Sequence, residues 1–337
     1  MGRSSAFRDS DFGELRDLSE ATATVAGACA AGVFSGLASE GATPDELATR
    51  LELSARAMEI LLPFLEELGL VTAEEGRFEL TERARRELAD PSDPAYCAGG
   101  LPLWLGNLEA WTRLPQALAS GNPVRKGGAD AGGDDPESQR EGIARFMAGM
   151  AAAPRERVQR LVEGVMARCP EASTLLDVGG GPGHMSRAFI ERGLTATLLD
   201  RPQVVQFVDE EYELAQADGL TTVGGDFLED PLPQGPFDVV LLSNVLHMLS
   251  PDQARVLVSK AGEVTRPGGV VAVADFIRGL SPRATRFALV MLLRSEGGNT
   301  YTLEEHERWF QDGGFAGVEV RDLDPDRQLV TAIRQGG

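Results

Sequence analysis

The chain has 337 residues, which is long enough for two domains with separate hydrophobic cores. Its hydrophobic fraction of 42% and charged fraction of 25% are ordinary for a globular protein. The formal net charge of −20, from 32 basic and 52 acidic residues, argues against nucleic acid or an anionic membrane surface as the main partner.

Cysteine usage and the lack of a recognisable targeting signal favour the cytoplasm. Cys29, Cys97 and Cys169 are scattered without the spacing of a metal site or a disulfide framework. No stretch has the length and bulky apolar composition of a membrane span. We therefore expect a cytoplasmic protein that is not inserted in a membrane.

Residues 1–100 are expected to be mainly helical and to end in a small hairpin. The helix over 43–51 begins with threonine and proline, and a glutamate follows three residues after the threonine, which is typical of a capped helix start. A second helix is expected over 54–68, followed by short strands over 70–72 and 77–80. This order of elements is the winged-helix pattern.

A winged helix can bind DNA or mediate dimerisation. In the helix over 54–68, Arg56 is outnumbered by Glu59, Glu66 and Glu67, so its charge would repel phosphates. The charge balance favours a dimerisation domain whose apolar surface is buried against a second copy of the chain.

Residues 101–168 are expected to form linking helices interrupted by one flexible segment. The stretch 120–138 is rich in glycine and proline with mixed charge, which is typical of a flexible connection or a lid. A helix that carries Phe146, Met147 and Met150 is expected to follow and to lead into the C-terminal domain.

Residues 169–337 alternate between apolar strands and helical stretches, which predicts an α/β fold with a parallel sheet covered by helices on both faces. The last two strands are too close in sequence for a crossover and are expected to pair antiparallel. The expected strands are 174–178, 195–199, 221–224, 237–242, 269–275, 316–322 and 328–334.

Candidate binding residues stand at the carboxyl ends of these strands, where open α/β sheets bind their ligands. The first strand runs into a glycine turn at 179–183, which lets a ligand lie against bare backbone. Asp200 ends the second strand, where a carboxylate can accept both hydroxyls of a ribose. Asp226 and Phe227 follow the third strand and suit an adenine, and His247 follows the fourth.

Two cofactors fit the first two features. A nicotinamide dinucleotide favours G-x-G-x-x-G before a helix N-terminus, whereas this turn reads G-x-G-x-G with Pro182 before the last glycine. The acid after the third strand and the terminal hairpin favour S-adenosylmethionine (SAM), which has no phosphate. We therefore expect SAM as the cofactor and S-adenosylhomocysteine as its product.

The chain resembles the class I SAM-dependent methyltransferases, specifically the plant-type and bacterial secondary-metabolite O-methyltransferases. The family pairs an N-terminal winged-helix dimerisation domain with a Rossmann-like SAM domain, and the resemblance covers nearly the whole chain. It rests on Leu176-Asp-Val-Gly-Gly-Gly-Pro-Gly183, Leu199-Asp200, Gly225-Asp226-Phe227, Phe237-Asp-Val-Val240 and Arg266-Pro-Gly-Gly269.

The resemblance implies a domain order of dimerisation domain (1–100), linking helices and loop (101–168) and SAM domain (169–337). It implies that Asp200 binds the ribose and that Asp226 and Phe227 bind the adenine, with Ser243 near the methionine tail. The methionine part would be cradled by Asp177, Gly179, Gly180, Gly181 and Gly183.

His247 matches the catalytic base of the family, and a neutral imidazole can accept a hydroxyl proton near neutral pH. Two departures stand out. The segment after the histidine reads Met-Leu instead of the usual Asp-Trp, and no acid follows Gly297-Gly298 to steady the histidine. Asp275 at the end of the fifth strand, or less favourably Glu296, is the expected replacement.

No metal site is expected. Carbon methylation beside a ketone with a bound metal would need a second ligand facing His247, and the helix 286–294 offers Met291 but no histidine. His306 lies in an acidic helix where we expect it to be solvated, and His184 lies beside the glycine turn.

These observations predict a homodimeric SAM-dependent methyltransferase of secondary metabolism, such as antibiotic biosynthesis, that acts on a hydroxyl of an aromatic or polyketide-like metabolite. A carbon or nitrogen methyltransferase and a non-catalytic SAM-binding regulator stay open as alternatives. The apolar acceptor pocket is expected to draw on Trp104, Trp111, Phe146, Met150, Phe287 and Met291, each of which could instead be core.

Overall fold

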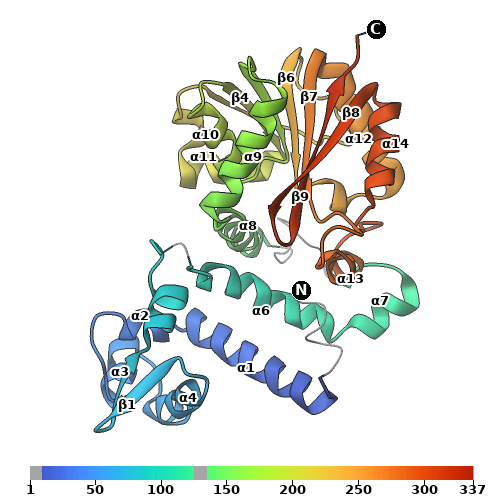
Figure 1. Ribbon diagram of the computed structural model, residues 1–337. Helices are drawn as coiled ribbons and strands as arrows, with labels where there is room; N and C mark the ends of the chain where they lie inside the picture. Colours follow the sequence, from blue (N-terminus) through green and yellow to red (C-terminus); the bar gives the residue numbers. More distant parts are fainter. Residues whose placement is uncertain (1–9, 94, 125–134, 337) are drawn as a thin grey trace. The chain divides into compact units, whose positions relative to one another are not determined.

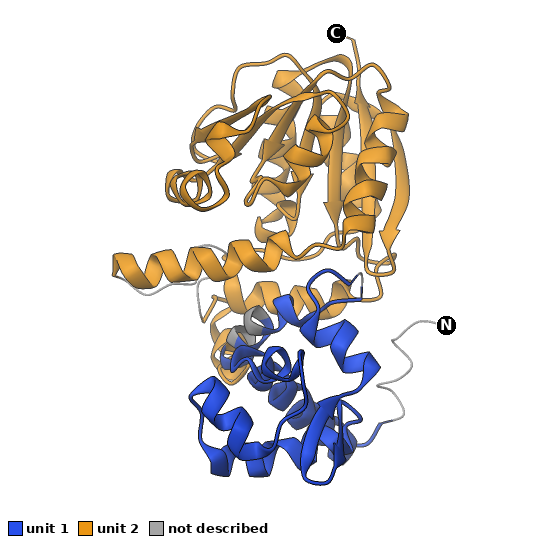
Figure 2. Ribbon diagram, turned by 90° about the vertical axis from the view of Figure 1, so that its left-hand side faces the viewer, with its two compact units in different colours: residues 1–109 blue, residues 110–337 orange. Residues whose placement is uncertain are grey.

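A computed structural model describes residues 10–93, 95–124 and 135–336, and the chain divides into two compact units, residues 1–109 and 110–337 (Figure 2). The middle of the expected flexible segment, residues 125–134, lies outside the described residues. Each unit contains its own cluster of buried apolar side chains, as the chain length predicts.

The first unit contains the predicted helices and hairpin. Thr43 and Glu46 form the predicted capping box, because each side chain accepts a hydrogen bond from the backbone N–H of the other. Ser54 stands at the next N-cap but forms no side-chain cap. The elements are α1 (Phe12–Ala30), α2 (Val33–Leu37), α3 (Pro44–Leu51), α4 (Ala55–Glu67), β1 (Val71–Glu74), β2 (Arg77–Leu80), α5 (Glu82–Ala84) and α6 (Leu101–Trp111), which crosses the boundary between the units.

The second unit is built on a seven-stranded sheet in the order β5-β4-β3-β6-β7-β9-β8 (Figure 1). The first five of these pair in parallel, and β9 pairs antiparallel with both β7 and β8, as predicted. The strands are β3 (Thr174–Val178), β4 (Thr195–Asp200), β5 (Leu220–Gly224), β6 (Phe237–Ser243), β7 (Thr265–Asp275), β8 (Phe315–Asp324) and β9 (Arg327–Arg334).

Helices cover both faces of this sheet, and each face has its own core. One core packs α9, α10 and α11 against the sheet, and the other packs α12 and α14 (Figure 1). The helices are α7 (Leu114–Ser120), α8 (Pro136–Ala151), α9 (Arg155–Arg168), α10 (His184–Ile190), α11 (Pro202–Tyr212), α12 (Pro251–Val264), α13 (Ala284–Arg294) and α14 (Leu303–Asp312).

The strand order determines where a ligand can bind. β3 lies between β4 and β6, so the chain turns to opposite sides after β3 and opens a crevice at the carboxyl ends of these strands. Because Gln328 at the start of β9 pairs with Asp275 at the end of β7, the β8–β9 turn returns to the same edge of the sheet.

Candidate active site

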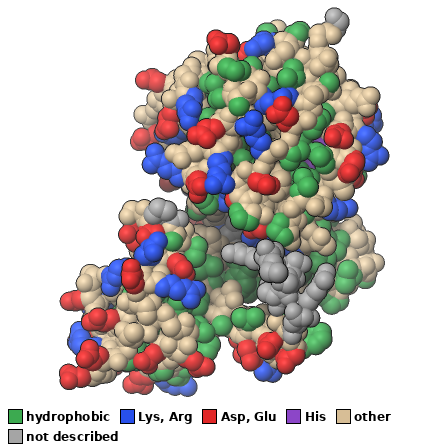
Figure 3. Space-filling model, in the orientation of Figure 1, with side chains coloured by type: hydrophobic (Ala, Val, Ile, Leu, Met, Phe, Trp, Pro, Cys, Tyr) green, Lys and Arg blue, Asp and Glu red, His purple; other side chains and the backbone are tan. Residues whose placement is uncertain are grey.

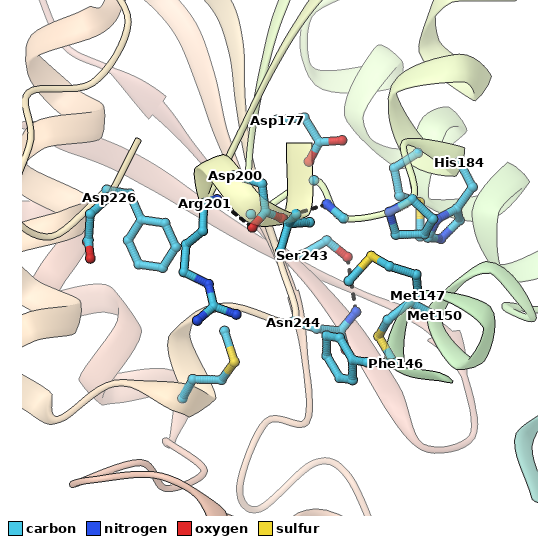
Figure 4. A pocket seen from close by; sticks show the side chains of 18 of the residues that line it. Phe146, Met147, Met150, Asp177, His184, Asp200, Arg201, Asp226, Ser243 and Asn244 are labelled. Carbon is cyan, nitrogen blue, oxygen red and sulfur yellow. Dashed lines mark hydrogen bonds between the residues drawn. The ribbon is translucent and has the colours of Figure 1, made fainter. Parts of the chain in front are cut away.

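A cavity of about 240 Å³ opens at the carboxyl ends of β3, β4 and β6 (Figure 4). It gathers most of the residues that the sequence assigned to the cofactor, together with three from α8, one of which is Met147. The predicted residues that line the cavity are Phe146, Met150, Asp177, Gly179, Gly180, Gly181, Asp200, Asp226, Phe227 and Ser243.

The glycine turn after β3 needs residues without side chains. Gly179, Gly181 and Gly183 have φ angles of 69°, 52° and 72°, which L-residues with a Cβ seldom adopt. A Cβ on Gly180 would lie 2.5 Å from Cγ of Leu198, so this backbone packs directly on β4. The turn therefore keeps bare main chain along the cavity wall.

Two carboxylates stand behind this turn, that of Asp177, which is buried, and that of Asp200, which is half-buried. Asp200 Oδ2 accepts a hydrogen bond from the Gly181 N–H at 2.9 Å, and burial raises the pKa of Asp200. Asp177 accepts from the Ser186 hydroxyl at 2.7 Å, and burial raises its pKa to about 6. Both carboxylates are poorly solvated, so a cationic or hydroxyl-bearing ligand would stabilise their ionised forms.

The loop after β5 is fixed by a lysine that sequence reasoning missed. Asp226 and Phe227 line the cavity, and the Asp226 carboxylate accepts from the Leu228 N–H at 2.8 Å. Lys260 on α12 donates to the carbonyls of Phe227, Leu228 and Asp230 at 3.1, 2.5 and 2.9 Å. A lysine 33 residues away gives no local pattern that predicts these contacts.

Three of the further lining residues have polar side chains that were not assigned to the cofactor from the sequence. Arg201 follows Asp200, and His184 begins α10. Asn244 adopts a φ of 58°, and its amide donates to the Ser243 hydroxyl at 3.3 Å, so its carbonyl oxygen is left buried without a donor among the described residues (Figure 4). A buried acceptor without a donor suits a ligand that carries a hydrogen-bond donor.

His247 and Asp275 form a buried pair beside the cavity. His247 Nδ1 lies 2.7 Å from Asp275 Oδ1, and Asp275 also accepts from the backbone N–H of His247 and of Phe276. Burial alone would raise the pKa of Asp275, but the charge and hydrogen bond of His247 outweigh it and the pKa lies below its usual value. Of the two acids considered from the sequence, Asp275 makes this contact, and Glu296 lies on the loop after α13.

The pair is surrounded by aromatic rings. Phe287 on α13 meets the His247 ring edge-to-face at 4.9 Å, and Phe276 stacks on Phe287 at 4.2 Å. Met248, and not His247 itself, lines the cofactor cavity. Met291 is buried on α13 away from that lining, and Trp104 lies on α6 outside the unit that carries the cavity.

The expectation for His306 was wrong. Its side chain is buried, with 1% exposed, and Nδ1 donates to the Thr302 carbonyl at 2.8 Å. The acidic residues of α14 lie on its outer face, whereas His306 shares the inner face with Trp309 and Phe310. Across the described residues, no three His, Cys, Asp or Glu side chains gather as a metal site would require.

Comparison with known proteins identifies the family. A family model for the O-methyltransferase domain matches residues 129–316, and one for the O-methyltransferase dimerisation domain matches residues 15–90. The chain belongs to the O-methyltransferase family, whose members use SAM as methyl donor.

Two curated relatives from Streptomyces span most of the chain. The tetracenomycin polyketide synthesis 8-O-methyl transferase TcmO of Streptomyces glaucescens is 31% identical over 86% of both chains. The 3-hydroxy-5-methyl-1-naphthoate 3-O-methyltransferase of Streptomyces sahachiroi is 29% identical over 92% of this chain and 91% of that one. Human N-acetylserotonin methyltransferase in complex with SAM shares the fold with a TM-score of 0.81 at 20% identity, covering 100% of both chains.

The cavity fits SAM by its own chemistry. Its wall, as far as the described residues form it, presents three carboxylates, Asp177, Asp200 and Asp226, and one guanidinium, that of Arg201. SAM carries a sulfonium and an ammonium against one carboxylate, so its net positive charge suits this wall better than the phosphates of a dinucleotide would. The protein is thus a SAM-dependent methyltransferase of the O-methyltransferase family.

Proposed function

We propose that the protein transfers a methyl group from SAM to a hydroxyl of a small aromatic or polyketide-like metabolite, with His247 as general base. The observation that carries the proposal is the 2.7 Å contact between His247 Nδ1 and Asp275, next to a cavity suited to SAM. When bound, SAM supplies a methyl group already activated by its sulfonium, so the protein's own residues mainly align the acceptor and move one proton.

The hydrogen bond to Asp275 decides which nitrogen of His247 acts. An ionised carboxylate can only accept, so Nδ1 carries the proton and Nε2 keeps its lone pair. His247 retains 8% of its side-chain surface exposed, through which an acceptor can be reached. Nε2 then takes the hydroxyl proton, and Asp275 stabilises the imidazolium that results.

The residues of the cavity wall would each bind a different part of SAM. We assign the ribose hydroxyls to Asp200, the adenine to Asp226 and Phe227, and the methionine part to Asp177 and the glycine turn over 179–183. Ser243 and Asn244 flank the same wall and offer a hydroxyl and an unpaired carbonyl oxygen to the methionine part.

Apolar side chains near His247 would form the walls of the acceptor site. Phe146 and Met150 project from α8 into the cavity (Figure 4), and Phe287 covers the His247 ring. Flat apolar rings suit such walls. The two curated relatives are named for a polyketide and a naphthoate acceptor, which supports an aromatic or polyketide-like acceptor here.

We also propose a homodimer in the cytoplasm, with dimerisation through residues 1–100, linking helices over 101–168 and the SAM domain from residue 169. The dimerisation-domain match and the free state of all three cysteines support this assignment. On the face of the second unit seen in Figure 3, basic side chains are interspersed with acidic ones, which does not favour nucleic acid as a partner. No helix in the described parts of the chain could span a membrane.

The direct test is incubation with methyl-labelled SAM and a panel of hydroxylated naphthalenes and anthraquinones. We expect labelled methyl ethers, identified by mass spectrometry and by the position of the methyl in NMR spectra. Products methylated at carbon or nitrogen would identify the protein as a carbon or nitrogen methyltransferase with the same fold. SAM binding without any transfer would favour a regulator.

A further inference from the structure

Arg327 is a half-buried arginine with no carboxylate at ion-pair distance among the described residues. It begins β9 at the carboxyl edge of the sheet, and its guanidinium lies over the Phe276 ring, with Cζ 4.2 Å from the centroid. Its Nε is buried and finds no acceptor, and no carboxylate in the described part of the chain forms an ion pair with the guanidinium. Buried donors seldom lack an acceptor, so a partner from outside the chain is expected.

The neighbouring acids are already committed to other groups. Asp324 Oδ1 accepts the backbone N–H groups of Asp326 and Arg327, and Asp324 Oδ2 pairs with Arg157 at 2.6 Å. Asp326 pairs with Arg283 at 3.6 Å, and Asp275 is held by His247. Among the described residues, the Arg327 guanidinium is therefore left without a carboxylate at ion-pair distance.

Arg327 adjoins the proposed acceptor side of the active site. It covers Phe276, which stacks on Phe287, the ring that meets His247. Burial and then repulsion from Arg157 lower the pKa of Arg327 to about 10, so the guanidinium stays charged at neutral pH. The Asp275 carboxylate is near enough to oppose that lowering, which places Arg327 within electrostatic reach of the His247 pair.

Further buried nitrogens without a hydrogen-bond partner lie beside Arg157. Both ring nitrogens of His184 are buried and have no partner among the described residues, whereas Arg157 Nε lies 2.6 Å from Asp324 Oδ2. The charge of Arg157 lowers the pKa of both His184 and Arg327, so the three side chains are neighbours. Since His184 lines the cofactor cavity, this cluster of donors borders the active site.

We propose that Arg327 binds an anionic group of the acceptor, a carboxylate carried on the same ring system as the hydroxyl that is methylated. The inference rests on the proposed function, because it takes the space beside His247 as the acceptor site. A guanidinium presents paired N–H donors that match a carboxylate, and its stacking on Phe276 fixes the plane of that fork. The acceptor class is thus a hydroxylated aromatic acid.

A carboxylate could also come from the methionine part of SAM, and calorimetry separates the two sources. The acceptor pair is 3-hydroxy-2-naphthoate and 2-naphthol, which differ only in the carboxylate, each titrated into full-length protein saturated with S-adenosylhomocysteine. The cofactor pair is S-adenosylhomocysteine and methylthioadenosine, which lacks the amino-acid end. Each titration is run on wild type, on Arg327→Met, and on Arg321→Met, a control at an exposed position of β8.

Wild type is expected to bind the naphthoate about tenfold to a hundredfold more tightly than the naphthol, the range for one charge-assisted pair. Arg327→Met should erase that difference without changing the affinity for the naphthol or for either cofactor ligand. Arg321→Met should bind all four ligands with the affinities of wild type. The melting temperature of Arg327→Met should not fall, because the replacement removes a half-buried charge that forms no ion pair among the described residues. An arginine with a purely structural role would instead lower it.

Equal binding of naphthoate and naphthol by wild type, or no binding of the naphthoate, overturns the proposal. The proposal is also overturned if Arg327→Met loses affinity for S-adenosylhomocysteine alone. That result would assign the guanidinium to the carboxylate of the cofactor. Failure of the proposed function is a separate result: no methyl would pass from SAM to any hydroxyl, whatever the binding data show.

Discussion

Asp275 accepts three hydrogen bonds, two of them from His247, and this fixes both the position and the tautomer of the imidazole. Asp275→Asn keeps the size of the side chain but removes the charge that stabilises an imidazolium. Because a general base contributes about 10²–10⁴-fold, we expect kcat to fall about tenfold to a hundredfold while the affinity for SAM stays constant. Steady-state kinetics on a methylated acceptor measure this.

The matched control for that substitution is Glu296→Gln, which alters the other acid that the sequence offered as a partner for His247. It should leave kcat within twofold of wild type. Equal losses in the two variants would mean that a general drop in negative charge, and not the contact with His247, causes the effect.

His184 should make stability depend on pH. Burial, and then repulsion from Arg157, lower the pKa of His184 to about 4, against about 6.5 for an unfolded chain. Between these two pKa values, the unfolded state binds a proton at His184 that the folded state does not bind. The free energy of unfolding that is present above about pH 6.5 is therefore lost as the pH falls toward about 4. The loss is at most about 3 kcal/mol, because a tenfold difference in proton affinity corresponds to about 1.4 kcal/mol.

Urea unfolding at pH 7 and pH 4.5 measures this contribution. His184→Gln should lose less stability between the two values than wild type does, since glutamine has no proton to take up. An equal loss in both proteins would show that His184 is protonated without cost in the folded state.

At the level of single residues, the sequence predicted the location of those side chains that stand at a strand end. Asp200, Asp226 and Asp275 are examples, because each stands where a parallel strand stops. Asn244 and Lys260 could not be predicted, because one depends on a left-handed backbone and the other on a long-range contact. His306 was misjudged because the acidic composition of α14 hides its apolar inner face.

The glycine turn after β3 is the element whose backbone matters most. Gly181 has a φ of 52°, and a Cβ there would lie 3.6 Å from Met147 Sδ, another residue of the cavity wall. Gly181→Ala should therefore weaken SAM binding about tenfold or more, with about 1 kcal/mol of backbone strain. Calorimetry with SAM and urea unfolding separate the two effects.

Gly193→Ala is the matched control for the turn. Gly193 also has a positive φ, of 92°, but an added Cβ would meet no atom within 4 Å among the described residues. It should carry a similar loss of stability and bind SAM as wild type does. If both variants lost the same affinity for SAM, backbone strain would explain the result, and the methyl group added to the cavity wall would not.

The elements themselves followed from the sequence more closely than the site did. All seven strands of the large sheet formed where apolar runs stood. β7 begins at Thr265, earlier than predicted, because Arg266-Pro-Gly-Gly269 reads as a turn but continues the strand. His247 lies in a short 3-10 turn before α12, which begins only at Pro251.

At the scale of the whole molecule, we expect the N-terminal unit to dimerise the chain. The match to a dimerisation domain over residues 15–90 predicts a stable homodimer. Light scattering coupled to size exclusion should give twice the 36.0 kDa mass of one chain at micromolar concentration. A monomer that still transfers methyl groups would show that dimerisation is dispensable.

The fold class and the presence of a separate core in each unit were predictable, because they depend on periodicity, length and strand-end motifs. The surroundings of His247 were not, because they combine α13, the end of β7 and the β8–β9 turn, which tertiary packing brings together. That Arg327 lacks an ion pair among the described residues becomes evident only once its neighbours Asp324 and Asp326 are seen to bind other arginines.

The most direct test of the account is single-turnover transfer of labelled methyl from SAM to a phenolic acceptor, comparing wild type with His247→Ala at saturating ligands. We predict a rate about 10²–10⁴-fold lower in the variant, with unchanged SAM affinity by calorimetry, because only proton removal is lost. A rate within a few-fold of wild type would contradict a general base at His247 and leave positioning alone as the source of catalysis.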